Sequence, residues 1–62
     1  MCESTVYIEK GDEEEVVLKD VVFVEPRKDS VYIEDILGQS REIVGRIKLI
    51  DLVNHRVILT NE

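Results

Sequence analysis

Thiol and imidazole side chains, which most readily act as a nucleophile or a general base, are scarce in this 62-residue chain. One cysteine, Cys2, and one histidine, His55, are its only pairing of a nucleophile with a base. They stand at opposite ends of the sequence, and no Gly-rich phosphate loop or His-Glu-x-x-His pattern accompanies them. A chain this small also has little room for a substrate pocket. We therefore expect that the protein is not an enzyme.

Two other features could bind a cation, and both have plainer interpretations. The acidic run at residues 12–15 does not space its oxygen ligands around a glycine and end on a bidentate Glu, as a calcium loop does. We interpret this run as a solvated hairpin tip. His55 carries no motif around it, and we interpret it as a solvated residue of a turn.

Cys2 is informative through its position, because its thiol stands one residue from the α-amine. Its thiolate, a backbone nitrogen and the terminal amine could reach one metal ion through small chelate rings. Such ligands suit nickel or copper in square-planar sites, and thiolates suit zinc in tetrahedral sites. Two chains related by a two-fold axis could contribute one thiolate each. The alternative is that Cys2 is a small apolar residue beside the first strand, or an incidental terminal residue.

The charge and composition of the chain bear on its partners and its location. Fourteen Asp and Glu residues against eight Lys and Arg residues give a net charge of −6, and the basic residues are scattered. Nucleic-acid binding draws on clustered cations and stacked aromatic rings, so we expect no nucleic-acid partner. No apolar run approaches the roughly 20 residues of a membrane span, and we expect no signal peptide. These features predict a cytoplasmic protein with no membrane partner.

The elements that position these residues are predicted to be strands. Val, Ile and Thr supply 10, 7 and 2 residues and alanine is absent, a composition that favours strands over helices. Alternating or apolar runs predict strands at 4–9, 16–19, 21–25, 31–34 and 56–60, with the first two paired in an antiparallel hairpin. Turns are expected at 10–12, 26–30 and 51–55, and a bend or one short turn of helix at 36–40.

The stretch from residue 41 to residue 52 fits either a helix or a strand. A helical stripe would contain Ile43, Ile47 and Ile50. One face of a strand would contain Ile43, Gly45, Ile47 and Leu49. The branched residues and the glycine favour the strand. A glycine inside a strand marks a bulge or sharp bend, at which a long strand can turn a corner.

The predicted elements make one all-β domain over residues 1–62. We expect five or six short antiparallel strands in a small SH3-like or Sm-like barrel. A domain of about 60 residues buries only about 60% of the surface that its unfolded chain exposes, so its core is small. We therefore expect a homodimer, in which a second chain covers additional apolar surface.

The chain resembles the CooT-type small nickel-binding proteins, which are associated with maturation of nickel carbon monoxide dehydrogenase. The resemblance covers nearly the whole chain. It rests on Met1-Cys2, Leu18-Lys19-Asp20-Val21-Val22, Asp35-Ile36-Leu37-Gly38, Gly45-Arg46-Ile47-Lys48-Leu49-Ile50-Asp51 and Val57-Ile58-Leu59.

This resemblance implies a homodimer with its two amino termini close together and one Ni(II) ion bound between the chains through Cys2, the only ligand that carries over. It implies a metallochaperone whose partners are a nickel enzyme such as carbon monoxide dehydrogenase or its maturation proteins. Family members have also carried a predicted RNA-binding label, against which the charge of −6 argues here. The alternative function is an interaction or regulatory module without metal, whose edge strands pair with a partner protein.

Overall fold

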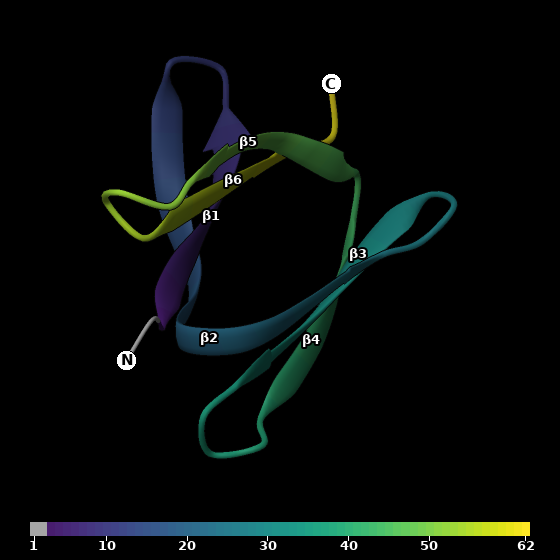
Figure 1. The fold of residues 1–62 in the computed structure, drawn as a ribbon. Coiled ribbons are helices and arrows are strands. Elements are labelled where there is room, and N and C mark those ends of the chain that lie inside the picture. Colours follow the sequence, from purple (N-terminus) through teal and green to yellow (C-terminus); the bar gives the residue numbers. More distant parts are fainter. Residues whose placement is uncertain (1–2) are drawn as a thin grey trace.

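The computed structural model describes residues 3–62, which form six strands and no helix (Figure 1). The strands are β1 (Ser4–Lys10), β2 (Glu13–Pro26), β3 (Ser30–Asp35), β4 (Ser40–Val44), β5 (Arg46–Asp51) and β6 (Arg56–Thr60). All six belong to one sheet with the order β4-β3-β2-β1-β6-β5. The predicted small all-β fold is confirmed. Within residues 3–62 no helix has the length and apolar character that crossing a membrane requires.

β1 and β2 form the antiparallel hairpin that the alternating pattern predicts, with Lys10 opposite Glu13. Val6 and Ile8 occupy the buried face of β1, as their period-two spacing requires. Gly11 takes up a positive φ of 62° in the two-residue turn, a conformation that costs glycine little.

β2 is one strand of 14 residues, whereas the sequence pattern predicts two short strands in its place. Its first half pairs with β1 and its second half pairs with β3. The change of partner occurs at Asp20, which has a left-handed φ of 57°. A single left-handed residue turns the chain sharply, and Asp tolerates this conformation better than most residues do. Figure 1 shows the resulting curve of β2, which descends beside β1 and then turns toward β3.

β6 lies between β1 and β5, parallel to β1 and antiparallel to β5. The prediction of antiparallel pairing throughout is wrong for β1 and β6. A parallel pair needs a long connection, and here nearly the whole domain separates the two strands. β6 is a central strand, and both of its faces are covered. The side chains that alternate along it are therefore all buried, namely Val57, Ile58, Leu59 and Thr60.

Gly45 joins the two edge strands, β4 and β5, at the predicted bend. Its N–H donates to the carbonyl of Asp29 at 3.0 Å, and its φ is +139°. A Cβ at this position would lie 2.4 Å from the carbonyl oxygen of Thr60, so only glycine allows the close approach. The bend carries the chain from β4 at one edge of the curled sheet to β5 at the other edge. The backbone ladders of residues 3–62 do not join β4 to β5, and the barrel is therefore open.

The core is a single cluster on the inner face of the curled sheet. Its buried members are Val6, Ile8, Val21, Val31, Ile33, Val57 and Leu59. A larger set of big apolar side chains is exposed, namely Val16, Val22, Phe23, Ile36, Leu37, Val44, Leu49, Ile50, Leu52 and Val53. This balance is the one expected of a domain too small to cover its own apolar surface.

Candidate functional site: the amino-terminal pole

Cys2, the predicted metal ligand, lies outside the described residues. The contacts of Ser4 and Thr5 show which parts of the fold surround the start of β1. Ser4 pairs with Val21, just after the bend in β2. The N–H of Thr5 donates to the carbonyl of His55 at 2.9 Å. The first residues of β1 therefore lie between β2 and the turn that connects β5 to β6.

The turn between β3 and β4 reaches the same place. The N–H of Ile36 donates to the carbonyl of Asp20 at 2.9 Å, next to the residue that pairs with Ser4. In Figure 1 the start of β1 lies between the β5–β6 turn and the β3–β4 turn. We call this region the amino-terminal pole: Ser4, Thr5, Asp20 and the turns at residues 36–39 and 52–55.

The β3–β4 turn of the pole is built around Asp35, which is 8% exposed. One of its carboxylate oxygens, Oδ1, accepts hydrogen bonds from the N–H groups of Leu37 at 2.9 Å and Gln39 at 2.8 Å. The backbone of the turn is closed by hydrogen bonds between the main-chain groups of Asp35, Gly38 and Gln39. The side chain thereby fixes the backbone that presents Leu37 to solvent.

The β5–β6 turn is built in the same way around Asp51. Its Oδ1 accepts from the N–H groups of Val53 at 3.1 Å and Asn54 at 3.0 Å, and its Oδ2 accepts from the Asn54 side-chain amide at 2.9 Å. These hydrogen bonds, above all those from Asn54, lower the pKa of Asp51 because they favour its charged form. Each apolar turn of the pole is thus held by the aspartate that precedes it.

His55 is exposed, as the prediction of a solvated turn residue requires, and it has a left-handed φ of 55°. The sequence places it far from Cys2, and the fold brings its backbone to the start of β1. The long-range parallel pairing of β1 with β6 is responsible, and no local pattern in the sequence signals such a pairing.

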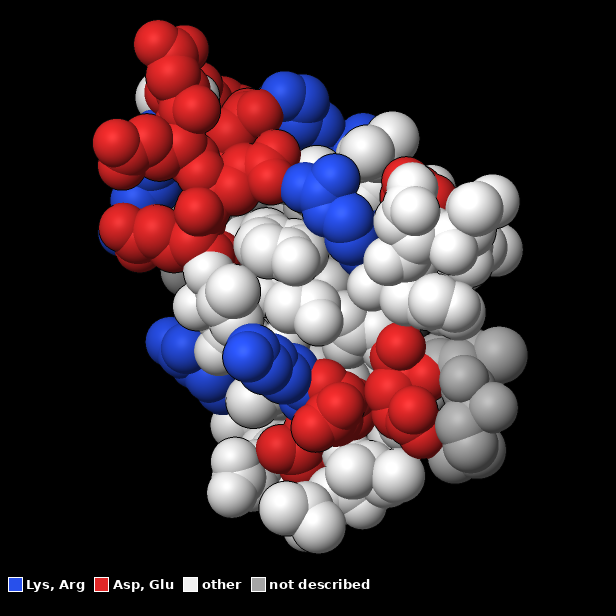
Figure 2. Space-filling model, turned by 90° about the vertical axis from the view of Figure 1, so that its left-hand side faces the viewer, with Lys and Arg blue, Asp and Glu red and all other residues white. Residues whose placement is uncertain are grey.

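The acidic run is exposed at the opposite end of the β1–β2 hairpin, which confirms the prediction of a solvated tip. Glu14 pairs with Arg56, and Glu15 lies 3.4 Å from the ammonium group of Lys10. Figure 2 shows the gathered Asp and Glu side chains at the upper end of the molecule. Among residues 3–62, no three His, Cys, Asp or Glu side chains are grouped as metal ligands.

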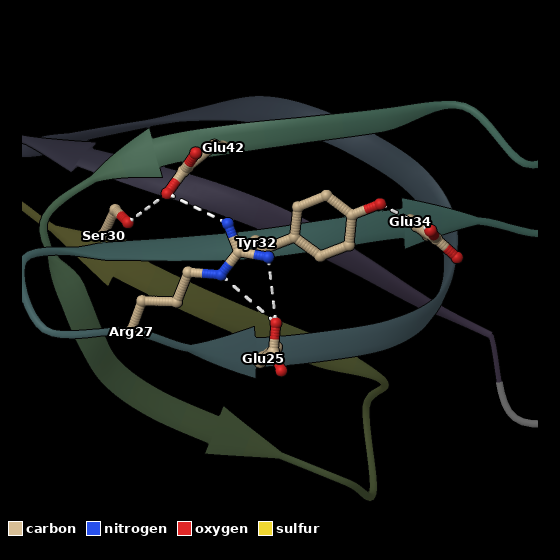
Figure 3. Close-up of polar contacts among 6 residues, drawn as sticks. All are labelled: Glu25, Arg27, Ser30, Tyr32, Glu34 and Glu42. Carbon is tan, nitrogen blue, oxygen red and sulfur yellow. Dashed lines mark hydrogen bonds and ion pairs between the residues drawn. The ribbon is translucent and has the colours of Figure 1, made fainter.

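The most connected polar cluster lies across β2, β3 and β4 (Figure 3). The Arg27 guanidinium bonds to Glu25 at 3.0 Å and to Glu42 at 3.3 Å, and it lies 4.6 Å from the centre of the Tyr32 ring. The Ser30 hydroxyl donates to Glu42 and, together with Arg27, lowers the pKa of that carboxyl group. These groups pair with one another, so the cluster ties three strands together.

A groove of about 320 Å³ opens between β4 and the β1–β2 hairpin, where the barrel is not closed. Ile8, Val17 and Ile43 contribute its apolar lining. The Arg41 guanidinium spans it and donates to the carbonyl of Val17 at 3.1 Å. One side of β4 carries no partner strand within the described sheet, so its edge faces this groove.

Comparison with known proteins places these features in a family. Residues 1–60 match the family model for the CO dehydrogenase accessory protein CooT. The chain belongs to the CooT family. The fold agrees with a crystal structure of a protein assigned as CooT from Carboxydothermus hydrogenoformans, with a TM-score of 0.89 and 38% sequence identity over 98% of each chain. The resemblance seen in the sequence is confirmed.

Two further relatives come from Methanothermobacter and Methanocaldococcus species. An uncharacterized protein from Methanothermobacter thermautotrophicus is 39% identical over all 62 residues, which make up 92% of its own length. Another, from Methanocaldococcus jannaschii, is 36% identical over 95% of this chain and 96% of its own length. CooT is described as an accessory protein of CO dehydrogenase, and that description fits a role other than catalysis.

Proposed function

We propose that this chain is a nickel-binding accessory protein that carries Ni(II) for the maturation of a nickel enzyme. The metal is held by Cys2, shared between the two chains of a homodimer. The observation that carries the proposal is the match of residues 1–60 to the accessory protein of CO dehydrogenase, in a chain with its only cysteine at the second residue. The receiving enzyme is CO dehydrogenase or a related nickel enzyme of the cytoplasm.

The chemistry of the donors supports nickel as the cargo. A thiolate combined with backbone and terminal nitrogens is a strong-field ligand set, which suits square-planar Ni(II). A second chain related by a two-fold axis supplies a second thiolate without any further cysteine in the sequence.

The test is to measure nickel binding by equilibrium dialysis for the wild type, Cys2→Ser and His55→Asn. The wild type should bind about one nickel ion per two chains, and Cys2→Ser should bind none because a hydroxyl does not replace the thiolate. His55→Asn is the matched control, since Asn also tolerates the left-handed backbone at this position. Unchanged binding by Cys2→Ser would refute the proposal, and loss of binding in His55→Asn alone would move the site to the histidine.

A second function is favoured by the open groove beside β4. An extended segment of a partner protein could add to this edge by backbone hydrogen bonding, which makes the chain an interaction module without metal. The same dialysis experiment separates the two functions, because an interaction module of this kind binds no nickel in either the wild type or the variants.

A further inference from the structure

Two unpaired strand edges border the groove beside β4. The first half of β2 pairs with β1, and its second half pairs with β3 after the bend at Asp20. Within residues 3–62, no strand pairs with the other edge of that first half or with the outer edge of β4. Residues 15–17 of β2 and residues 41–44 of β4 both line the groove. The open side of the barrel is therefore a place where a further strand can be added.

One side chain bridges these two edges. The Arg41 guanidinium donates from Nη1 to the carbonyl oxygen of Val17 at 3.1 Å, so a side chain of β4 reaches the backbone of β2. The backbone ladders of residues 3–62 do not join the two strands. A carbonyl that accepts from a surface side chain can accept instead from the backbone N–H of an added strand.

The lining of the groove suits an extended segment with apolar side chains. Ile8, Val17 and Ile43 contribute to it, together with Val16 and Val44, which are 51% and 71% exposed. Successive side chains of a strand point to opposite faces. A segment in which apolar residues alternate with polar ones therefore places its apolar side chains against this lining while its backbone pairs with an edge.

One charge of the groove has no partner of opposite sign. Lys10 lies 3.4 Å from a carboxylate oxygen of Glu15, and Glu42 pairs with Arg27. Arg41 forms no ion pair with a carboxylate of residues 3–62. A guanidinium has five N–H donors and binds a carboxylate through two of them at once. The unmatched charge of the groove is therefore positive and complementary to a carboxylate.

The net charge of −6 has little influence on a contact at Arg41. At physiological ionic strength the Debye length is about 8 Å, so carboxylates farther away than this are largely screened. The two carboxylates that line the groove, Glu15 and Glu42, each have a cation beside them. A carboxylate brought into contact with Arg41 therefore meets a local surplus of positive charge.

We propose that the groove binds an extended segment of a partner protein in which apolar residues alternate with polar ones, and in which one polar residue is Asp or Glu. On binding, the Arg41 guanidinium leaves the Val17 carbonyl and pairs with the carboxylate of the segment. The freed carbonyl accepts from a backbone N–H of the segment, so neither group is left unpaired. The inference rests on the edge pairing proposed above as the second function, and it does not depend on nickel at Cys2.

The probes are two sets of fluorescently labelled peptides of about six residues, the usual length of a strand, in which Val alternates with Thr. One Thr is replaced by Glu at each position in turn in the first set, and by Gln in the second set. Fluorescence anisotropy at an ionic strength of about 0.15 M measures binding to the wild type, Arg41→Gln, Arg41→Lys and Lys28→Gln. Lys28 is exposed and does not line the groove, so its variant is the matched control for the loss of one positive charge.

The wild type should bind the best Glu peptide about fivefold more tightly than its Gln counterpart, as for one ion pair at an exposed site. Arg41→Gln should bind the two peptides equally, whereas Lys28→Gln should keep the full preference and Arg41→Lys part of it. The backbone amide NMR signals of residues 15–17 and 41–44 in the wild type should shift when the Glu peptide is added. Circular dichroism checks that each variant is folded.

Three results would overturn the inference. If the wild type binds Glu and Gln peptides equally and the same amide signals shift, the edge pairing of the second function stands and the carboxylate preference fails. If no peptide binds, the edge pairing fails as well, and the nickel dialysis above tests the first function separately. If the same amide signals shift when the protein is concentrated without peptide, the occupant of the groove is a second copy of the chain.

Discussion

The N–H of Thr5 donates a hydrogen bond of 2.9 Å to the carbonyl of His55, and this contact joins the beginning of the chain to the last turn before its final strand. It is the first step of the parallel pairing between β1 and β6. The start of β1 is thereby placed beside the apolar β5–β6 turn, and residues from both ends of the sequence contribute to one pole of the fold.

Nickel binding should depend on pH, because the thiol of Cys2 must lose its proton before it can ligate a metal. The apparent affinity is expected to fall as the pH drops below about 7, and binding should release protons. Isothermal titration calorimetry in buffers of different ionisation enthalpy measures both effects. An affinity that does not change between mildly acidic and mildly basic pH would count against thiolate ligation.

Asp35→Ala should destabilise the fold by about 1–3 kcal/mol, since it removes the hydrogen bonds that the buried Asp35 carboxylate accepts from the N–H groups of Leu37 and Gln39. Asp35→Asn is the matched control, because its amide oxygen can still accept and should preserve part of this stability. Urea unfolding followed by circular dichroism provides the comparison. Equal stability of the alanine variant and the wild type would show that the carboxylate does not hold the turn.

Gly45→Ala should destabilise the fold more than Gly11→Ala. Both residues have positive φ, which costs an alanine about 1–2 kcal/mol. At Gly11 the added Cβ meets nothing within 4 Å, whereas at Gly45 it would lie 2.4 Å from a backbone oxygen that cannot move aside easily. Thermal unfolding of the two variants tests this order, and a reversed order would contradict the close approach of Gly45 to Thr60.

The carboxyl group of Glu42 should titrate below its ordinary pKa, because Ser30 and Arg27 favour its charged form. A pKa that is lower in the folded state than in the unfolded state adds stability at pH values above the unfolded pKa. This contribution is lost as the pH falls through the folded pKa. NMR titration of the Glu42 side chain should show the low pKa in the wild type and a higher one in Ser30→Ala. An unchanged pKa in that variant would contradict the assigned cause.

The elements that depend on local patterns could be predicted from the sequence. Val6 and Ile8 alternate with polar residues and lie in the core, and Gly45 marks the bend where the chain passes between the sheet edges. The continuity of β2 through Asp20 could not be predicted, because a charged residue between two apolar runs normally signals a turn. The parallel pairing of β1 with β6 has no local signal in the sequence, because it depends on how the rest of the domain folds between the two strands.

The candidate site also contains residues that the sequence indicates and residues whose role only the fold shows. The position of Cys2 in the sequence and the resemblance to CooT point to this residue, and its role as a nickel ligand stays a prediction. Asp35 and Asp51 each precede a turn, and in that position Asp often accepts hydrogen bonds from the backbone N–H groups that follow it. Their importance to the pole depends on which turns lie beside the start of β1, and only the three-dimensional fold shows this.

The central claim is that one nickel ion is shared by two chains through Cys2. Native mass spectrometry of the wild type during titration with nickel measures the number of chains and metal ions in each complex directly. We expect a species of two chains with one nickel ion, which is favoured over the metal-free dimer as nickel is added and is absent for Cys2→Ser. A single chain with nickel bound, as the dominant species at every protein concentration, would contradict the shared site.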